Sequence, residues 1–213
     1  MRRSNLLARQ GRRPSGLLGH VVGRIMARET HVANQIALDV LALSPTDDVL
    51  EVGFGHGRTL AEAALLVTEG RLAGVDPSEV MLQIARRRNA AFLKTGRMEL
   101  KLGVSEHLPW PAESFDKAYA VHTIYFWPRP ARDLAEIHRV LRADGRLVLG
   151  YRPSEDAGFA RDFPADIYNI RSIAEIERVV SEAGFSGVET RSKALGHSLM
   201  AWTVATRSSR AQS

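Results

Sequence analysis

Three glycines at alternate positions, Gly53, Gly55 and Gly57, follow the short apolar run 49–52. Glycine adopts positive φ at little steric cost, and it lets a ligand approach the main chain because it has no Cβ atom. A strand that ends in such a turn and continues into a helix is a frequent binding site for nucleotide-like ligands. The spacing therefore predicts a ligand-binding turn between a strand at 49–52 and a helix that begins near residue 58.

The charged residues around this turn indicate which ligand it binds. The usual dinucleotide turn, G-x-G-x-x-G, sets a pyrophosphate against the N-terminus of a helix and has its third glycine where this chain has Arg58. Glu51, two residues before Gly53, would repel a pyrophosphate and attract a cation. S-adenosylmethionine fits these residues, since it carries a sulfonium and an ammonium but no phosphate. Its ribose still needs an acid, and Asp76, nineteen residues after Gly57, stands at about the expected offset.

Five ordered segments resemble class I S-adenosylmethionine-dependent methyltransferases, and in particular their small-molecule branch, the methyltransferase type 11-like proteins. The similarity covers roughly residues 45–206 and implies a Rossmann-like α/β fold. That fold is a doubly wound, seven-stranded, mostly parallel sheet with helices on both faces and an N-terminal helical lid. The resemblance also implies S-adenosyl-L-methionine as methyl donor and S-adenosyl-L-homocysteine as product. The segments are Glu51-x-Gly53-x-Gly55-x-Gly57, Gly74-Val75-Asp76-Pro77-Ser78, Ser105-Glu106-His107-Leu108-Pro109, Ser114-Phe115-Asp116 and residues 141–147.

The resemblance assigns the cofactor site residue by residue. Glu51 would order the turn and the ammonium end of the cofactor, and Asp76 would accept hydrogen bonds from both ribose hydroxyls. The family usually has an acid for the adenine amino group where this chain has Val104. Recognition of adenine would then depend on the backbone amide of Ser105 and on Glu106 or a water. The expected cofactor-binding residues are Glu51, Gly53, Gly55, Gly57, Asp76, Pro77, Met81, Val104, Ser105, Glu106 and His122.

The segment after the predicted fourth strand, residues 122–128, is the expected acceptor side of the site, because ligands of doubly wound sheets bind at the carboxyl ends of the strands. His122 and Tyr125 are the predicted catalytic residues. His122 would orient the acceptor or act as its base, and Tyr125 and Trp127 would form walls of the acceptor pocket. The alternative for all three is ordinary packing. No metal site is predicted, since the chain has no cysteine and its seven histidines lack close pairing.

Alternating strand and helix patterns must position these residues. Strands are expected at 49–52, 71–76, 98–102, 115–121 and 146–151, with two final strands at about 188–192 and 199–206. Helices are expected from 58 to about 68, after Ser78, from 132 to 141 and from 172 to 182, with Ser78 and Ser172 as N-caps. Residues 152–171 contain proline and glycine without clean periodicity, and we expect them to form an excursion beside the site.

The two ends of the chain differ from its body in charge. Residues 1–28 contain seven arginines and no acid, and Arg207 and Arg210 lie at the other end. We expect a flexible basic N-terminus at 1–13, the helical lid at 14–43, the methyltransferase domain at 44–206 and a flexible tail at 207–213. An Arg-rich, acid-free start is also typical of organellar transit peptides, but the helical periodicity of 21–43 favours a packed segment and a cytoplasmic protein.

Three functions remain open at this point. The first is methyl transfer to an O, N or S atom of a small molecule, by a monomer or homodimer that binds neither nucleic acid nor membrane. The basic ends leave open a methyltransferase for RNA or protein, and Val104 leaves open a non-catalytic protein that binds S-adenosylmethionine or S-adenosylhomocysteine. The mildly acidic body favours the first function, because a nucleic-acid binder would be expected to place its basic residues on a folded face.

Overall fold

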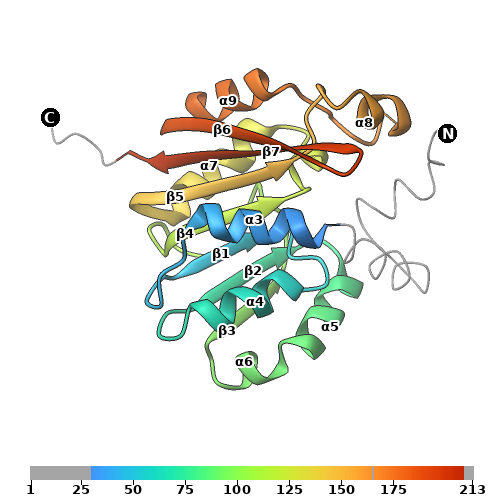
Figure 1. Cartoon of the computed structure of the whole chain (residues 1–213). Coiled ribbons are helices and arrows are strands. Elements are labelled where there is room, and N and C mark those ends of the chain that lie inside the picture. The colour runs from blue at the N-terminus through green and yellow to red at the C-terminus, as the bar shows by residue number, and fades with distance from the viewer. Residues whose placement is uncertain (1–29, 165, 209–213) are drawn as a thin grey trace, which may run out of the picture.

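A seven-stranded sheet organises the computed structural model, which describes residues 30–164 and 166–208 (Figure 1). The strand order is β3-β2-β1-β4-β5-β7-β6, and β7 alone runs antiparallel to its neighbours. This arrangement confirms the predicted doubly wound, mostly parallel sheet. The strands are β1 (Val49–Val52), β2 (Leu72–Asp76), β3 (Met98–Leu102), β4 (Phe115–Val121), β5 (Leu141–Tyr151), β6 (Phe185–Leu195) and β7 (Ser198–Arg207).

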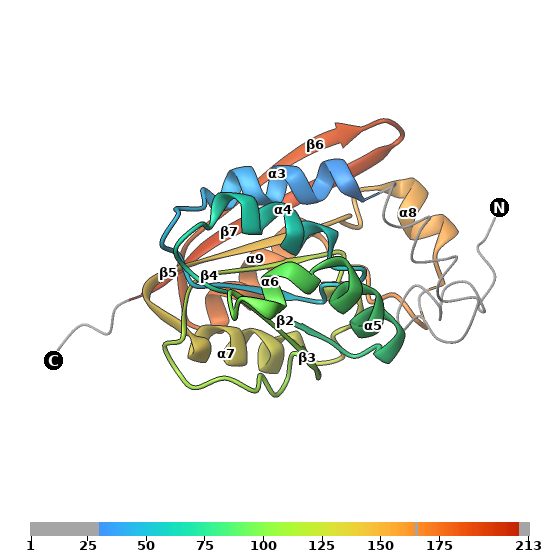
Figure 2. The same ribbon diagram turned by 90° about the horizontal axis from the view of Figure 1, so that it is seen from below.

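Helices cover both faces of the sheet (Figure 2). One apolar cluster lies between the sheet and the helices α3, α4 and α5 on one face. A second apolar cluster lies between the sheet and the helices α7 and α9 on the other face. The helical elements are α3 (His31–Leu41), α4 (Arg58–Leu66), α5 (Glu79–Arg88), α6 (Ala90–Lys94), the 3₁₀ helix η1 (Ile124–Phe126), α7 (Pro130–Val140), α8 (Ala157–Asp162) and α9 (Ile173–Glu182). None of the helices in the described part of the chain has the length and apolar composition of a membrane span.

Local sequence signals explain where several of the helices begin. The Ser78 hydroxyl accepts a hydrogen bond from the Met81 amide at 3.3 Å, and Ser172 forms a capping box with Glu175, so both predicted N-caps are confirmed. Helix α7 begins two residues earlier than expected, because a proline is well tolerated in the first turn of a helix. The excursion at 152–171 contains the short helix α8, which the sequence patterns did not predict.

The predicted lid at 14–43 is described only in part. Helix α3 packs its buried residues against β4, β5 and β7, and the Trp202 indole donates a hydrogen bond to the Ala33 carbonyl at 3.0 Å. The body of α3 therefore covers a face of the sheet, while its first turn reaches the strand ends through Thr30 and Asn34. Residues 1–29 lie outside the described residues, so the lid and the flexible N-terminus stay predictions. The predicted tail begins too early, since Arg207 is the last residue of β7.

Candidate active site

The glycine turn between β1 and α4 has the backbone conformation that its sequence predicts. Gly53, Gly55 and Gly57 all have positive φ, at 80°, 52° and 69°. A Cβ atom on Gly53 would lie 2.2 Å from Cγ2 of Thr123, whereas nothing lies within 4 Å of a Cβ on Gly55. The turn is therefore packed tightly against the end of β4 at its first glycine and open toward a ligand at its second.

Gly57 packs against the end of helix α5. A Cβ atom there would lie 2.7 Å from both the Cβ of Ala85 and Nδ2 of Asn89. The fully buried Asn89 side chain donates a hydrogen bond to the Gly57 carbonyl at 2.9 Å. Gly57 does not line the cavity described below, so it shapes the turn through α5 and does not face the ligand.

Asp76, at the end of β2, holds the turn through its carboxylate. One oxygen accepts a hydrogen bond from the Gly55 amide and the other from the Ser78 amide, both at 2.8 Å. A carboxylate can accept about four hydrogen bonds, so these two do not exclude the ribose hydroxyls expected from the sequence. Asp76 thus connects the glycine turn to the start of α5, in addition to its expected role in binding ribose.

Glu51 is a buried carboxyl group in β1 with a partner of its own. The Tyr119 hydroxyl donates a hydrogen bond to its Oε2 at 2.9 Å. Burial raises the pKa of Glu51 well above its ordinary value, and the nearby Asp76 and Glu62 carboxylates add to this effect. A cation bound beside Glu51 would favour its ionised form. The residue is therefore electrostatically suited to the ammonium of S-adenosylmethionine.

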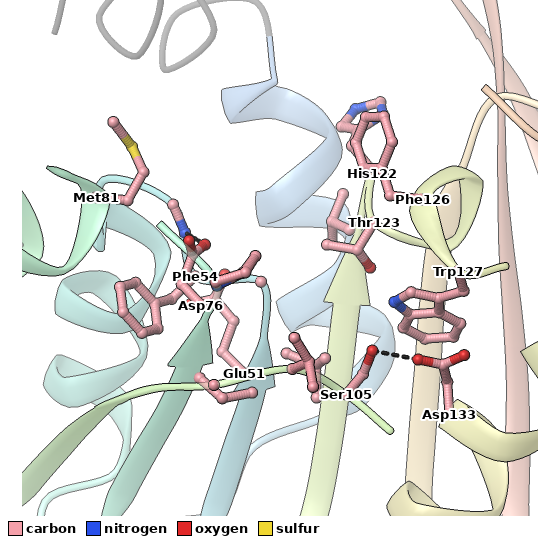
Figure 3. A pocket seen from close by; sticks show the side chains of 18 of the residues that line it. Glu51, Phe54, Asp76, Met81, Ser105, His122, Thr123, Phe126, Trp127 and Asp133 are labelled. Atoms are coloured by element: carbon pink, nitrogen blue, oxygen red, sulfur yellow. Dashed lines mark hydrogen bonds between the residues drawn. The ribbon is translucent and has the colours of Figure 1, made fainter. Parts of the chain in front are cut away.

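One cavity of about 450 Å³ brings the predicted residues together at the carboxyl ends of the parallel strands (Figure 3). In Figure 3, Glu51, Asp76 and Met81 lie on one side, and His122, Phe126 and Trp127 lie on the other. Of the predicted cofactor-binding residues, all but Gly57 line this cavity: Glu51, Gly53, Gly55, Asp76, Pro77, Met81, Val104, Ser105, Glu106 and His122.

His122 follows β4 in a left-handed backbone conformation, with φ of 58°. Its Nδ1 lies 3.2 Å from the Tyr125 hydroxyl, which itself accepts a hydrogen bond from the Arg152 amide. The direction of the His122–Tyr125 contact depends on the imidazole tautomer: when the hydroxyl donates to Nδ1, the neutral imidazole carries its proton on Nε2. Burial, together with Arg152, lowers the pKa of His122 to about 4. In that tautomer His122 is a hydrogen-bond donor near neutral pH, and its lowered pKa disfavours the base role that the sequence left open.

Tyr125, the other predicted catalytic residue, lies behind His122. It is 3% exposed and does not line the cavity. Its ring packs among Phe126, Phe159 and Tyr168. The predicted wall of the acceptor pocket is therefore corrected: Trp127 lines the cavity, whereas Tyr125 supports His122 from the core.

Asp133, in the first turn of α7, is a cavity residue that sequence reasoning missed. Its side chain is almost fully buried, and its Oδ1 accepts a hydrogen bond from the Ser105 hydroxyl (Figure 3). Burial raises the pKa of Asp133 to about 6, with Glu106 contributing. An acid in the first turn of a helix normally indicates a favourable interaction with the helix dipole, so the sequence carried no signal of a site residue here.

Glu106 has a different partner. Its two carboxylate oxygens accept hydrogen bonds from Nε and Nη2 of Arg129, at 3.2 and 3.1 Å. No group of three or more His, Cys, Asp or Glu residues within the described ranges has an arrangement that could hold a metal ion.

Comparisons with known proteins point to the same segment. A model of the methyltransferase domain matches residues 50–149, which contain the glycine turn, Asp76, Ser105, His122 and Asp133. The chain is 32% identical over 135 residues to the uncharacterized methyltransferase YdaC of Bacillus subtilis (strain 168), which covers 63% of this chain and 72% of that relative. The chain belongs to the class I S-adenosylmethionine-dependent methyltransferases. Its methyl donor is S-adenosylmethionine, as the resemblance implied.

Two further similarities show how far the relationship extends. The demethylmenaquinone methyltransferase of Symbiobacterium thermophilum is 39% identical over 108 residues, but the match covers only 49% of this methyltransferase and 42% of that one. Among solved structures, the methyltransferase bound to the Trm112 activator of Haloferax volcanii aligns with a TM-score of 0.77. That alignment covers 90% of this chain and 95% of the other at 20% identity, which shows a shared fold.

Proposed function

We propose that this methyltransferase transfers the methyl group of S-adenosylmethionine to an oxygen, nitrogen or sulfur atom of a small molecule. The observation that supports this proposal most directly is that one cavity joins Glu51 and Asp76 to the aromatic wall of Phe126 and Trp127. Its volume, about 450 Å³, lies within the usual range for small-molecule sites. A cofactor held on the acidic side would share this space with an acceptor of modest size.

The charges around the cavity favour a small neutral or cationic acceptor over RNA. Among the residues that the structure describes, four acids and one arginine line the cavity, and this arginine, Arg129, is paired with Glu106. A phosphate backbone would meet the ionised carboxylates among them, such as Asp76 and Glu106, and repulsion of this kind opposes nucleic-acid binding. The acids that line the cavity are Glu51, Asp76, Glu106 and Asp133.

Each side of the cavity has its own task in the proposed reaction. Glu51, Asp76 and the turn at 53–57 would hold the cofactor, which supplies an electrophilic methyl group when bound. His122 would donate its Nε2–H to the acceptor and fix the direction of the attacking lone pair. Because its pKa is about 4, His122 is neutral near neutral pH, and a proton released by a protonated acceptor would pass to solvent. The protein contributes mainly by orientation, which can lower a barrier by several kcal/mol.

Calorimetry with S-adenosylhomocysteine tests the cofactor side. We expect Asp76→Ala to weaken binding by at least about 2 kcal/mol, roughly 30-fold, because hydrogen bonds to a charged acceptor are lost and the turn loses its anchor. Asp39→Ala, an exposed acid on α3, is the matched control and should bind as the wild type does. Equal binding by Asp76→Ala and wild type would remove Asp76 from the site.

A screen of methyl-donor consumption over phenols, amines and thiols tests the acceptor class. Turnover with a member of this panel supports the proposal. Turnover only with RNA or a protein, lost when residues 1–12 are removed and sensitive to salt, would overturn it in favour of the macromolecular alternative. Binding of S-adenosylhomocysteine without turnover on any acceptor would instead support the non-catalytic alternative that Val104 suggested.

A further inference from the structure

Residues 103–106 lie beside the residue that is expected to hold the ribose. In the sheet, Asp76 of β2 is in register with Leu102 of β3, and the Gly103 amide donates a hydrogen bond to the Asp76 carbonyl at 3.1 Å. A base attached to a ribose at Asp76 would therefore meet the side chains that follow β3. These side chains must supply the polar contacts that distinguish adenine from other bases.

The residues after β3 offer few acceptors for the amino group of adenine. Val104 is half exposed and apolar. Glu106, which the sequence suggested for this role, already shares both carboxylate oxygens with Arg129 and is one candidate. Ser105 is the other candidate, and its hydroxyl is bonded to the buried Asp133 carboxylate on α7.

The contact with Asp133 determines what the Ser105 hydroxyl can do toward a ligand. A hydroxyl has one proton to donate and two lone pairs to accept with. Oδ1 of Asp133 accepts the hydrogen bond that this proton makes, so the Ser105 oxygen can act toward a ligand only as an acceptor. Oδ2 of Asp133 is buried and has no hydrogen-bond partner among the described residues. The hydrogen bond from Ser105 is thus the one that most directly stabilises the Asp133 carboxylate. This stabilisation keeps the hydroxyl proton of Ser105 directed toward Asp133.

We propose that Ser105 and Asp133 together recognise the 6-amino group of adenine in the cofactor. Ser105 Oγ is the contact, and Asp133 is the positioning residue that keeps the Ser105 proton directed away from the ligand. In related proteins an acid at the position of Val104 would accept the hydrogen bond from the amino group. Here Ser105 and Asp133, from two segments far apart in the chain, would supply that acceptor together. This inference rests on the proposed function, since it requires S-adenosylmethionine in the cavity.

The pair makes a specific prediction about ligand selectivity. A free serine hydroxyl can rotate, and it can accept from an amino group or donate to a carbonyl. A hydroxyl fixed by Asp133 can only accept, so it favours adenine and disfavours hypoxanthine, in which a carbonyl replaces the 6-amino group. Sites that hydrogen-bond a particular group reject analogues without it, because a buried polar atom is then left unpaired.

The test is calorimetry at pH 8 with S-adenosylhomocysteine and its deaminated analogue S-inosylhomocysteine. Wild type should prefer the adenosyl compound by roughly 10- to 100-fold, which is the value of one hydrogen bond between a donor and a charge-assisted acceptor. Asp133→Ala should bring this ratio close to one, partly through tighter binding of the inosyl compound. Ser105→Ala should also lower the ratio, and the double variant should lower it no further than Ser105→Ala alone, because the two residues act as a unit.

Two further variants make the test specific. Ser181→Ala, a serine on α9 that bonds only within its helix, should keep the wild-type ratio. Glu106→Gln tests the competing acceptor directly, because Glu106 also lines the cavity. A ratio that is unchanged in Ser105→Ala and Asp133→Ala, or that is lost in Glu106→Gln, would overturn the inference.

The outcomes separate this inference from the proposed function. If neither nucleoside binds to wild type, the proposed function fails. If S-adenosylhomocysteine binds with the same selectivity in all variants, only the assignment of Ser105 and Asp133 fails. Should Asp133→Ala not fold, Ser105→Ala still decides the question, because it leaves the buried acid in place.

Discussion

The two sides of the cavity are built in different ways. The cofactor side is a continuous piece of backbone, in which one turn between β1 and α4 is held by Asp76 from the adjacent strand. The opposite side is assembled from side chains of three separate segments: Ser105 after β3 and Asp133 on α7, which we propose reach the adenine of the cofactor, and His122 after β4. The first side is rigid because glycines allow its conformation, whereas the second depends on individual hydrogen bonds between residues far apart in the chain. Substitutions should therefore affect the two sides differently.

Gly53→Ala should have the largest effect, because it changes the backbone side. The new Cβ atom would lie 2.2 Å from Cγ2 of Thr123, and the residue would keep a φ of 80° that alanine rarely adopts. We expect a loss of about 2–4 kcal/mol in the free energy of unfolding, from overpacking and backbone strain together. Urea denaturation would measure this loss, and calorimetry should show binding of S-adenosylhomocysteine weakened by more than about 30-fold.

Two controls separate the clash from the strain. Gly96→Ala has a similar φ, 73°, with nothing within 4 Å of the new Cβ, so it should show only the strain, about 1 kcal/mol. Gly53→Ala combined with Thr123→Ser removes the clashing methyl group and should recover part of the stability. Equal losses in Gly53→Ala and Gly96→Ala would show that the contact with Thr123 is unimportant.

The side-chain half of the cavity should respond to pH. His122 is neutral when buried, with a pKa of about 4, whereas an unfolded histidine titrates near 6.5. The unfolded state therefore binds more protons between these values, and stability should fall as pH decreases from 6.5 to 4. Replacement of His122 by Gln removes this pH-dependent contribution to the free energy of unfolding. We expect the difference in unfolding free energy between His122→Gln and wild type to shift by about 2 kcal/mol in favour of the variant between pH 7.5 and pH 4.5.

His56 provides the matched comparison on the cofactor side, because burial and two arginines also lower its pKa to about 4. His56→Gln should show a shift of similar sign. Stability curves for His122→Gln and wild type that run parallel across this pH range would mean that His122 is not buried as a neutral group.

Asp133→Asn should act in the opposite direction. Burial raises the pKa of Asp133 to about 6, so the folded state retains a proton that the unfolded state has lost above about pH 4. The cost of this charge is fully present above pH 6 and disappears as pH falls through 6 to below 4. We expect the variant to be more stable than wild type by about 1–2 kcal/mol at pH 7.5 and by much less at pH 4, as measured by urea denaturation. A variant that is less stable at pH 7.5 would show that the ionised Asp133 stabilises the fold.

Much of the cofactor side could be predicted from the sequence, because its signals are local. The positive φ values of the turn, the strands at 98–102 and 115–121 and the caps at Ser78 and Ser172 follow from residue type and short-range spacing. Even here the sequence did not show that Gly57 packs against α5 and Asn89 instead of facing the ligand. That distinction requires the packing of two helices.

The opposite side could be predicted only in part. The position of His122 directly after a strand was enough to predict that it lies in the cavity. That position did not show which atoms surround its side chain. Ser105 and Asp133 are 28 residues apart, and only the packing of α7 beside the segment after β3 brings them together. The final strands are longer than predicted for a similar reason, since β6 and β7 extend by pairing with each other.

Tyr125→Phe should have the smallest effect and distinguishes a catalytic from a positioning role. The change removes the hydroxyl that connects Nδ1 of His122 to the Arg152 amide, without altering the aromatic packing. We expect a loss of about 1 kcal/mol in the free energy of unfolding and a change of less than about threefold in S-adenosylhomocysteine binding. The pKa of His122, followed by NMR of its ring protons, should rise toward its ordinary value, because the neutral form loses a hydrogen bond. If Tyr125 instead contacted the acceptor, turnover would fall while the His122 pKa stayed unchanged. The buried position of the ring argues for the first outcome, in which this tyrosine acts on the acceptor only through His122.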